Sequence, residues 1–192
     1  MRFLALMLSV MVGSSAMANE EPKYRLVAKN AAYEIRQYDD RAIVRTQTGD
    51  ADSGFGKLFR YISGANTSQS KIAMTVPVTQ SEKIAMTAPV TEQVSDGKTY
   101  MSFYLPAKYT LATAPLPTDP SVELATDKGG KFAVLQFSGR SSNAAFQKKS
   151  KDLRAALIDD GMSFFDVPIR ATFNAPFTPG FMRRNEIMFR LK

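Results

Sequence analysis

The chain has 192 residues, and 25 lysine and arginine residues against 18 acidic residues give it a formal net charge of +7. It contains no histidine, cysteine or tryptophan. The lack of histidine and cysteine excludes Ser-His and Cys-His catalytic pairs, disulfide bonds and the usual zinc sites. Phosphate-binding glycine motifs are also absent from the sequence. We therefore expect a protein that is not an enzyme.

The first eighteen residues are typical of a secretory signal peptide. Arg2 precedes an apolar run from Phe3 to Val12, and Ala16-Met17-Ala18 is a small-residue cleavage site. The run is shorter than the roughly 20 residues that span a bilayer, and no later apolar stretch is longer. We expect cleavage after Ala18, export to the periplasm or the outside, and a single domain over residues 19–192.

The beginning of the mature chain predicts two strands. Residues 19–30 are polar and predict a loose lead-in. Residues 31–38 alternate in the manner of a strand, with Tyr33 and Ile35 on one face. Residues 41–48 predict a second strand after a turn.

A helix is predicted next, ending near Gly64. Its apolar residues recur at the spacing of one helical face and are Phe55, Leu58, Phe59 and Ile62. This stripe can pack into the sheet or line an apolar cleft. Lys57, Arg60 and Tyr61 lie off the stripe, so they are the better candidates for the rim of such a cleft.

Residues 71–79 and 83–91 repeat the phrase KIAMT-PVT with one difference between the copies. The proline of each copy cannot donate a ladder hydrogen bond, so each copy predicts a strand that ends there. We expect the second copy to be the core strand and the first to add an outer strand or a flap. Met74 and Met86 can fill the core or line an adaptable apolar pocket.

The rest of the chain predicts a hairpin, further strands and a second helix. Asp96-Gly97 is a strong turn signal for the hairpin. Residues 141–161 predict a helix whose inward face is Phe146, Ser150, Leu153 and Leu157. The remaining predicted strands lie at residues 99–106, 121–126, 131–139, 165–177 and 183–191.

Each half of the chain therefore carries strands and one helix. This order predicts an α+β fold, a distorted antiparallel β-barrel of two pseudo-repeated halves flanked by two α-helices.

Five stretches resemble the sequence blocks of the SOUL/heme-binding protein family, in the order of that family. They are residues 33–38, 54–66, 83–90, 102–106 and 176–189. The resemblance spans about residues 30–192 and implies the same barrel. It also implies binding of heme or another porphyrin. Together with the predicted signal peptide and the missing catalytic residue types, we expect an exported, non-enzymatic carrier, buffer or sensor.

Heme is an apolar plate with two carboxylates, so it needs an apolar cleft edged by arginine or lysine. The resemblance directs attention to the first helix and the loop at residues 176–184. The candidate cofactor-binding residues are Lys57, Leu58, Arg60, Tyr61, Met74, Met86, Phe181, Arg183 and Arg184. Without histidine, the iron would be coordinated by Met74, Met86 or Tyr61, or by no protein ligand.

Alternatives remain open at this point. The same fold could bind another apolar ligand or a protein partner, without physiological heme. Arg183 or Arg184 could pair with a propionate, or one of them could form an ion pair with Glu186 that seals the barrel end. We expect no nucleic-acid binding, because the basic residues near aromatic ones lie in elements with core periodicity.

Overall fold

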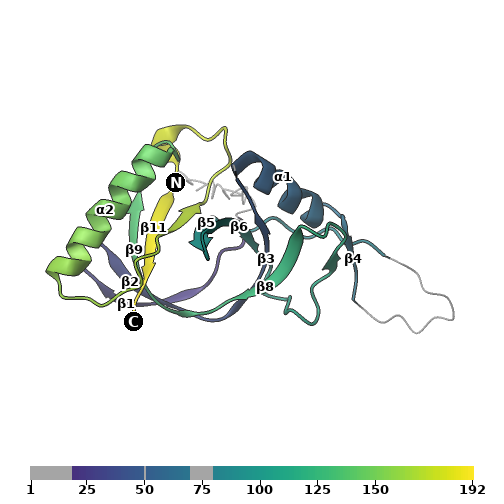
Figure 1. The fold of residues 1–192 in the computed structure, drawn as a ribbon, viewed down its shortest axis with the longest axis horizontal. Helices are drawn as coiled ribbons and strands as arrows, with labels where there is room; N and C mark the ends of the chain where they lie inside the picture. Colours follow the sequence, from purple (N-terminus) through teal and green to yellow (C-terminus); the bar gives the residue numbers. More distant parts are fainter. Residues whose placement is uncertain (1–18, 50, 70–79) are drawn as a thin grey trace, which may run out of the picture.

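The structure, a computed structural model, describes residues 19–49, 51–69 and 80–192. Within these residues a nine-stranded antiparallel sheet curls round, and two long helices flank it (Figure 1). The predicted α+β fold, a distorted antiparallel barrel with two helices, is confirmed. The expected signal peptide and the first copy of the repeated phrase lie outside the described residues.

The strands follow one another across the large sheet in the order β1-β2-β9-β11-β10-β5-β6-β3-β8. Their bounds are β1 Tyr24–Lys29, β2 Glu34–Tyr38, β3 Arg41–Gln47, β5 Val90–Ser95, β6 Lys98–Tyr104, β8 Val122–Asp127, β9 Gly130–Phe137, β10 Ile169–Thr172 and β11 Asn185–Arg190. A small separate sheet pairs β4 Asn66–Thr67 with β7 Leu116–Pro117. The helices are α1 Ala51–Ile62, α2 Asn143–Asp159 and the short 3-10 helix η1 Gly180–Met182.

Two bent stretches of chain join the halves of the sheet. β2 leads through Asp39-Asp40 into β3, and β8 leads through Lys128-Gly129 into β9. β2 pairs with β9 and β3 pairs with β8, so the stretch from β2 to β3 lies beside the stretch from β8 to β9 in both halves of the sheet. The bends also contact each other, because the Gly129 N–H donates to Asp40 Oδ1 at 2.9 Å. The curled sheet is therefore continuous through this double bend.

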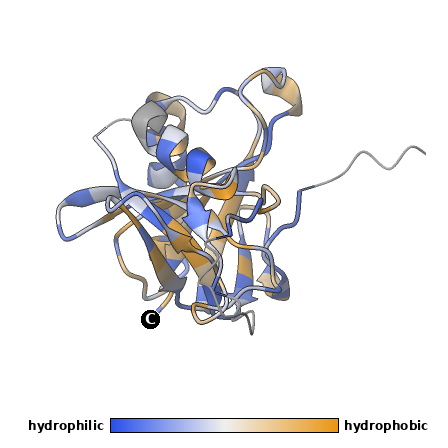
Figure 2. Cartoon of the chain, turned by 90° about the vertical axis from the view of Figure 1, so that its right-hand side faces the viewer, coloured by the Kyte–Doolittle hydropathy of each residue, from blue (hydrophilic) through white to orange (hydrophobic). Residues whose placement is uncertain are grey.

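Both helices pack against the same face of the sheet. Successive strand residues point to opposite faces. On β3, Val44 packs against the α1 side, whereas its neighbour Arg45 lines the interior of the barrel. On β9, Ala133 faces α2, whereas Phe132 faces the interior. Figure 2 shows orange, hydrophobic segments along the strands in the middle of the molecule.

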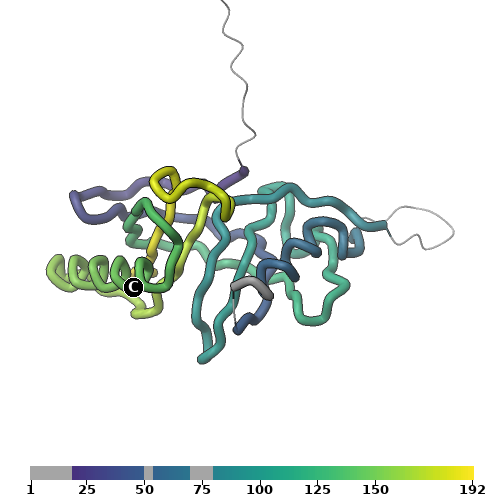
Figure 3. The backbone as a smooth tube through the Cα atoms, turned by 90° about the horizontal axis from the view of Figure 1, so that it is seen from above, coloured from purple at the N-terminus to yellow at the C-terminus, as the bar shows by residue number. Residues whose placement is uncertain are grey.

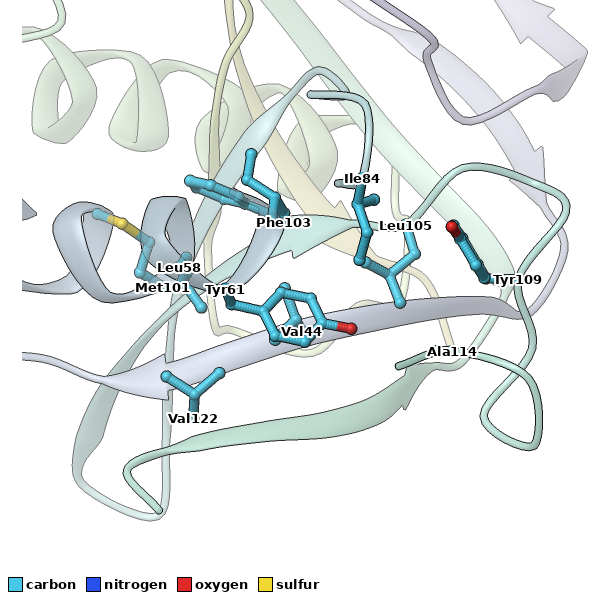
Figure 4. Close-up of a cluster of buried hydrophobic side chains, with 11 residues drawn as sticks. Val44, Leu58, Tyr61, Ile84, Met101, Phe103, Leu105, Tyr109, Ala114 and Val122 are labelled. Carbon is cyan, nitrogen blue, oxygen red and sulfur yellow. The ribbon is translucent and has the colours of Figure 1, made fainter. Parts of the chain in front are cut away.

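A hydrophobic cluster lies under α1 (Figure 4). Leu58, Tyr61 and Ile62 of the helix are at most 5% exposed and pack against Val44, Phe103 and other buried residues. Each such side chain contributes roughly 1.5–3 kcal/mol on burial. This cluster fixes the position of α1 on the sheet.

The second helix has the inward face predicted for it. Its buried residues are Phe146, Ser150, Leu153 and Leu157. The helix begins after Ser142, whose side-chain oxygen accepts a hydrogen bond from the Ala145 N–H at 3.2 Å. Such a cap satisfies a free N–H of the first turn.

Two strand predictions are wrong. The lead-in at residues 19–30 contains β1, an edge strand whose six residues are all exposed. In the second copy of the repeated phrase, only Val90 and Thr91 belong to a strand. The preceding residues are irregular, although Ile84 and Ala88 are buried. This copy fills the core without pairing along its length.

Candidate functional site

An open groove lies on the outer face of the sheet, between the two helices. Figure 3 shows β5 and β6 running between α2 and α1, and the groove crosses β5 and β10 there. Its volume is about 300 Å³. Its lining residues are Phe55, Val90, Glu92, Met101, Ser141, Asn143, Phe146, Arg170, Thr172, Asn174 and Pro176. We call it the interhelix groove.

Each helix contributes an aromatic wall to the interhelix groove. Phe55 of α1 stacks on Phe59 with ring centroids 5.9 Å apart and meets Phe103 edge-on at 5.3 Å. Phe146 of α2 meets Phe137 edge-on at 5.3 Å. Phe59 is 49% exposed, so it extends the apolar surface of α1 outward. The groove thus has two fixed aromatic sides.

Arg170 supplies a positive charge to this apolar groove. Its Nη1 donates to Asn143 Oδ1 at 2.8 Å and lies 3.9 Å from Glu92 Oε2. The guanidinium lies over the Phe146 ring, 5.4 Å from its centroid. The side chain is 29% exposed, so it remains accessible to an anionic group. A carboxylate on an apolar plate could bind here.

The chain after β10 forms one end of the groove. In Figure 1 this yellow-green segment arches between the two helices. Pro176 lines the interhelix groove and a neighbouring hollow of about 520 Å³, to which Arg140 and Arg183 also belong. Arg183 Nε donates to the Thr178 carbonyl at 2.7 Å, and Nη2 donates to the Pro176 carbonyl. Arg183 therefore stabilises the conformation of the loop.

A family model described as "SOUL heme-binding protein" matches residues 19–190. The chain belongs to the SOUL heme-binding protein family. It is 30% identical over 152 residues to heme-binding protein 2 of Homo sapiens, covering 76% of this chain and 71% of that protein. It is 24% identical over 180 residues to heme-binding protein 1 of Xenopus laevis, covering 88% of this chain and 91% of that protein. The resemblance read from the sequence is confirmed.

Solved structures share the fold at low identity. The EcmrR C-terminal domain aligns with a TM-score of 0.60 at 10% identity, covering 88% of this chain and 98% of that one. A hydrolase from Listeria innocua aligns with a TM-score of 0.54 at 12% identity, covering 86% of this chain and 94% of that one. These similarities show the curled fold of this SOUL-family chain and nothing of its activity.

Two helix residues predicted for the site lie in the core instead. Leu58 is fully buried, and Tyr61 is 1% exposed. The Tyr61 hydroxyl donates to the Pro115 carbonyl at 2.8 Å, and burial raises the pKa of this phenol. The expectation that Tyr61 lies at a cleft rim is therefore wrong. The helix is rotated so that Tyr61 is buried and Phe59 is exposed.

Lys57 and Arg60 do not edge the interhelix groove. A helix advances by about 100° per residue, so both lie on the opposite flank of α1 from Phe55. Arg60 Nη2 is 4.0 Å from Asp119 Oδ2. Hydrogen bonds from Ser121, followed by the charges of Lys57 and Arg60, hold the pKa of Asp119 below its ordinary value. These two cations face the segment before β8.

The structure describes two of the three candidates Met74, Met86 and Phe181 and places them in different surroundings. Met86 is partly buried against the core under α1. Met74 lies outside the described residues. Phe181 is 82% exposed on η1. Neither Met86 nor Phe181 lines the interhelix groove, whereas Met101, which the sequence did not single out, does.

Arg184 belongs to the barrel interior. Its Nε lies 3.5 Å from Glu186 Oε1, its Nη2 donates to Glu21 Oε2 at 2.5 Å, and its guanidinium lies 3.4 Å from the Phe173 ring centroid. The structure thus has the ion pair with Glu186 that was one of the two alternatives. The adjoining cavity of about 30 Å³ has room for about two water molecules, which is too small for a porphyrin.

No pattern in the sequence alone points to Arg170 as a residue of the site. It sits in a short strand whose neighbours come from distant segments, Glu92 on β5 and Asn143 on α2. Its role in the groove depends on that juxtaposition. In the described ranges, no cluster of acidic side chains could hold a metal ion. Among those same residues, no helix is long and apolar enough to cross a membrane.

Proposed function

We propose that this SOUL-family protein binds heme or another porphyrin in the interhelix groove. The observation that supports the proposal most is the pairing of aromatic walls, Phe55 and Phe146, with the accessible guanidinium of Arg170. A porphyrin has apolar faces for such walls and propionates for such a cation. Membership of the SOUL heme-binding protein family supports the same ligand.

The groove can accept a plate larger than its own volume because it opens into its neighbours. It shares Glu92, Asn143 and Arg170 with a hollow of about 360 Å³ on one side. It shares Ser141 and Pro176 with the hollow of about 520 Å³ on the other. A flat ligand could therefore lie across the outer face of β5 and β10 with one edge in solvent.

The lining fits an apolar plate but offers no strong axial ligand. The chain has no histidine or cysteine, and Met101 supplies the sulfur of the groove. Burial of roughly 400 Å² of ligand surface would give about 10 kcal/mol gross. Association itself costs about 4–15 kcal/mol, so we expect micromolar affinity or weaker. Such binding suits a non-enzymatic, exported carrier, buffer or sensor.

A Soret titration tests the proposal. Hemin and metal-free protoporphyrin IX are titrated into the protein, and both are expected to bind saturably at one-to-one stoichiometry. Arg170→Glu should weaken binding by about tenfold to a hundredfold, since a charge-assisted contact of about 1.5–3 kcal/mol is lost. Arg170→Gln removes the charge without adding a negative one and should weaken binding less.

Matched controls come from the other flank of α1. Lys57→Glu and Arg60→Glu make the same charge change at a half-buried and an exposed residue outside the groove, and they should leave porphyrin affinity unchanged. Non-saturating adsorption, or equal loss from the control variants, would contradict the groove as the site. Far-ultraviolet circular dichroism checks that each variant is folded.

A second candidate is the binding of another apolar ligand in the same groove, without physiological heme. The lack of any histidine in the chain favours it. Here a fluorescent apolar probe would bind with higher affinity than hemin, and Arg170→Gln would leave probe affinity unchanged. The relative affinities of the probe and hemin, and the effect of Arg170→Gln on each, decide between the two candidates.

A further inference from the structure

Three large apolar side chains protrude from one loop. In the segment at residues 176–182, Phe177 is 90% exposed, Phe181 is 82% exposed and Met182 is 63% exposed. Single exposed apolar residues are common, but three on one loop mark an interaction surface. None of the three side chains lines the interhelix groove. They are therefore free to contact something outside the protein.

The loop holds these side chains outward in a defined shape. The Met182 N–H donates to the Pro179 carbonyl at 2.9 Å, and the Arg183 N–H donates to the Gly180 carbonyl at 3.1 Å. Arg183 binds two further loop carbonyls through its side chain. Because the backbone is already fixed by these bonds, docking would cost little conformational entropy.

The two segments that meet at this loop are basic and carry no acid. Residues 139–151 contain Arg140, Lys148, Lys149 and Lys151, and residues 173–185 contain Arg183 and Arg184. They lie together, because the Gly139 N–H donates to the Gly180 carbonyl at 3.0 Å. Three of these cations already have partners. Lys149 pairs with the adjacent Asp152, Arg184 pairs with Glu21 and Glu186, and Arg183 donates to loop carbonyls. Arg140 lies beside Gly180 of the loop, and the exposed Lys148 follows in the first turns of α2, so the surface next to the apolar tips is basic.

We propose that this surface docks on an anionic lipid membrane. Phe177, Phe181 and Met182 would enter the boundary between headgroups and acyl chains, while Arg140 and Lys148 contact the anionic headgroups. A protein partner would need pockets that match three protruding side chains, whereas a fluid bilayer accommodates them without a matched shape. The charge around the tips is complementary to an anionic bilayer.

Membrane docking does not depend on porphyrin binding. The loop begins at Pro176, which lines the interhelix groove, so a docked protein would hold the mouth of that groove near the lipid surface. An apolar ligand dissolved in the bilayer could then enter the groove without crossing water.

Vesicle co-sedimentation tests the inference in the absence of any porphyrin. The protein is residues 19–192, which contain every described helix and strand. One set of vesicles holds equal parts of phosphatidylglycerol and phosphatidylcholine, and the other holds phosphatidylcholine alone. We expect binding to the anionic vesicles that weakens as salt is raised.

Two pairs of variants separate the apolar and the charged contributions. The triple variant Phe177→Ser, Phe181→Ser, Met182→Ser should weaken binding by about a hundredfold, because its insertable side chains are lost. Its control is Ile158→Ser with Phe165→Ser, two exposed apolar residues, one in the last turn of α2 and one in the segment that follows it. Lys148→Glu should weaken binding by about fivefold or more. Its control is Lys98→Glu, an equal charge change on the β5–β6 hairpin.

The outcomes are decisive in both directions. Selective loss in the triple variant and in Lys148→Glu supports membrane docking. Three results overturn it: no binding to anionic vesicles at low salt, equal binding by the triple variant, or equal losses in the controls. If the vesicles are not bound and the loop instead buries itself in a second copy or another protein, the membrane inference is also wrong.

Discussion

Arg36 and Glu186 form an ion pair inside the barrel. Arg36 Nη1 donates to Glu186 Oε2 at 3.0 Å, and the two side chains are 5% and 1% exposed. Glu34 meets the same guanidinium at 2.7 Å, and Tyr24 lies under it with its ring centroid at 4.4 Å. The charged groups of this interior are therefore held by one another and by aromatic faces.

The loss of charge at Glu186 should destabilise the protein strongly. Glu186→Gln keeps the shape of the side chain but leaves Arg36 with less compensation, so we expect a loss of about 3 kcal/mol in the free energy of unfolding. Urea unfolding measures it. Glu123→Gln is the control, because its pair with Arg45 is exposed and should contribute less than about 1 kcal/mol. Equal losses in the two variants would show that burial does not decide the strength of the Arg36 pair.

Asp127 should make stability fall as the pH rises through the acidic range. Burial raises the pKa of this carboxyl above its ordinary value of 3.8, and Tyr104 donates to it at 2.6 Å. Below that value both the folded and unfolded states are protonated. As the pH rises, the unfolded state loses its proton first, so the contribution of Asp127 to stability is lost until the raised pKa is passed.

The variant Asp127→Asn tests this assignment. It keeps an acceptor for the Tyr104 hydroxyl and cannot ionise. Its stability relative to the unsubstituted protein should therefore rise with pH across the window above 3.8. Urea unfolding at a series of pH values measures the difference. A difference that does not change with pH would contradict a raised pKa at Asp127.

A side chain at Gly129 should disrupt the double bend. A Cβ atom there would lie 2.4 Å from the Tyr38 carbonyl oxygen and 2.6 Å from the Asp39 carbonyl carbon, and backbone atoms cannot move aside cheaply. Gly129→Ala should cost about 3 kcal/mol or more of stability. Gly49→Ala, where a Cβ meets nothing within 4 Å, should be nearly neutral. Thermal unfolding compares the two, and a neutral Gly129→Ala would show that the bends can separate.

Substitutions on the buried face of α1 should lower stability without abolishing porphyrin binding. Tyr61→Phe removes the hydrogen bond to the Pro115 carbonyl and should cost about 1 kcal/mol. Leu58→Ala should cost about 2–5 kcal/mol. Porphyrin affinity of the folded fraction, measured at low temperature, should stay within about twofold. A selective loss of porphyrin affinity in Tyr61→Phe would show that Tyr61 does contribute to the binding site.

Apolar spacing in the sequence correctly predicted the helix that buries one complete face, α2. The inward face of α2 is correct residue for residue, and Asp96-Gly97 does turn the β5–β6 hairpin, with φ of 51° and 72°. In the first helix the predicted stripe is wrong at Phe59, which is 49% exposed, whereas Tyr61, placed off the stripe, is buried. Its orientation depends on partners from distant segments, because the buried Tyr61 hydroxyl donates to the Pro115 carbonyl.

Other features carry no local signal. β1 buries none of its residues, so its sequence YRLVAK shows no alternation, and only pairing with β2 makes it a strand. The groove residue Arg170 depends on α2 and β5, which are distant in sequence. Where burial occurs on one element, the sequence reveals it; where a site is assembled from several elements, the fold is needed first.

Asn66 has a consequence for the doubled phrase. Its side chain donates to the carbonyls of Tyr61 and Glu82 and accepts from the Glu82 N–H, while the Ser68 N–H donates to the Gln80 carbonyl. The chain is thus fastened to itself on both sides of the first copy. Lengthening the chain between these fastenings leaves the register of every strand in the described ranges unchanged, and the entropy of closing a longer segment rises only slowly with its length. A tandem duplication in the gene could enter here and persist without selection for a task of its own, and foreign peptides could be inserted at the same place.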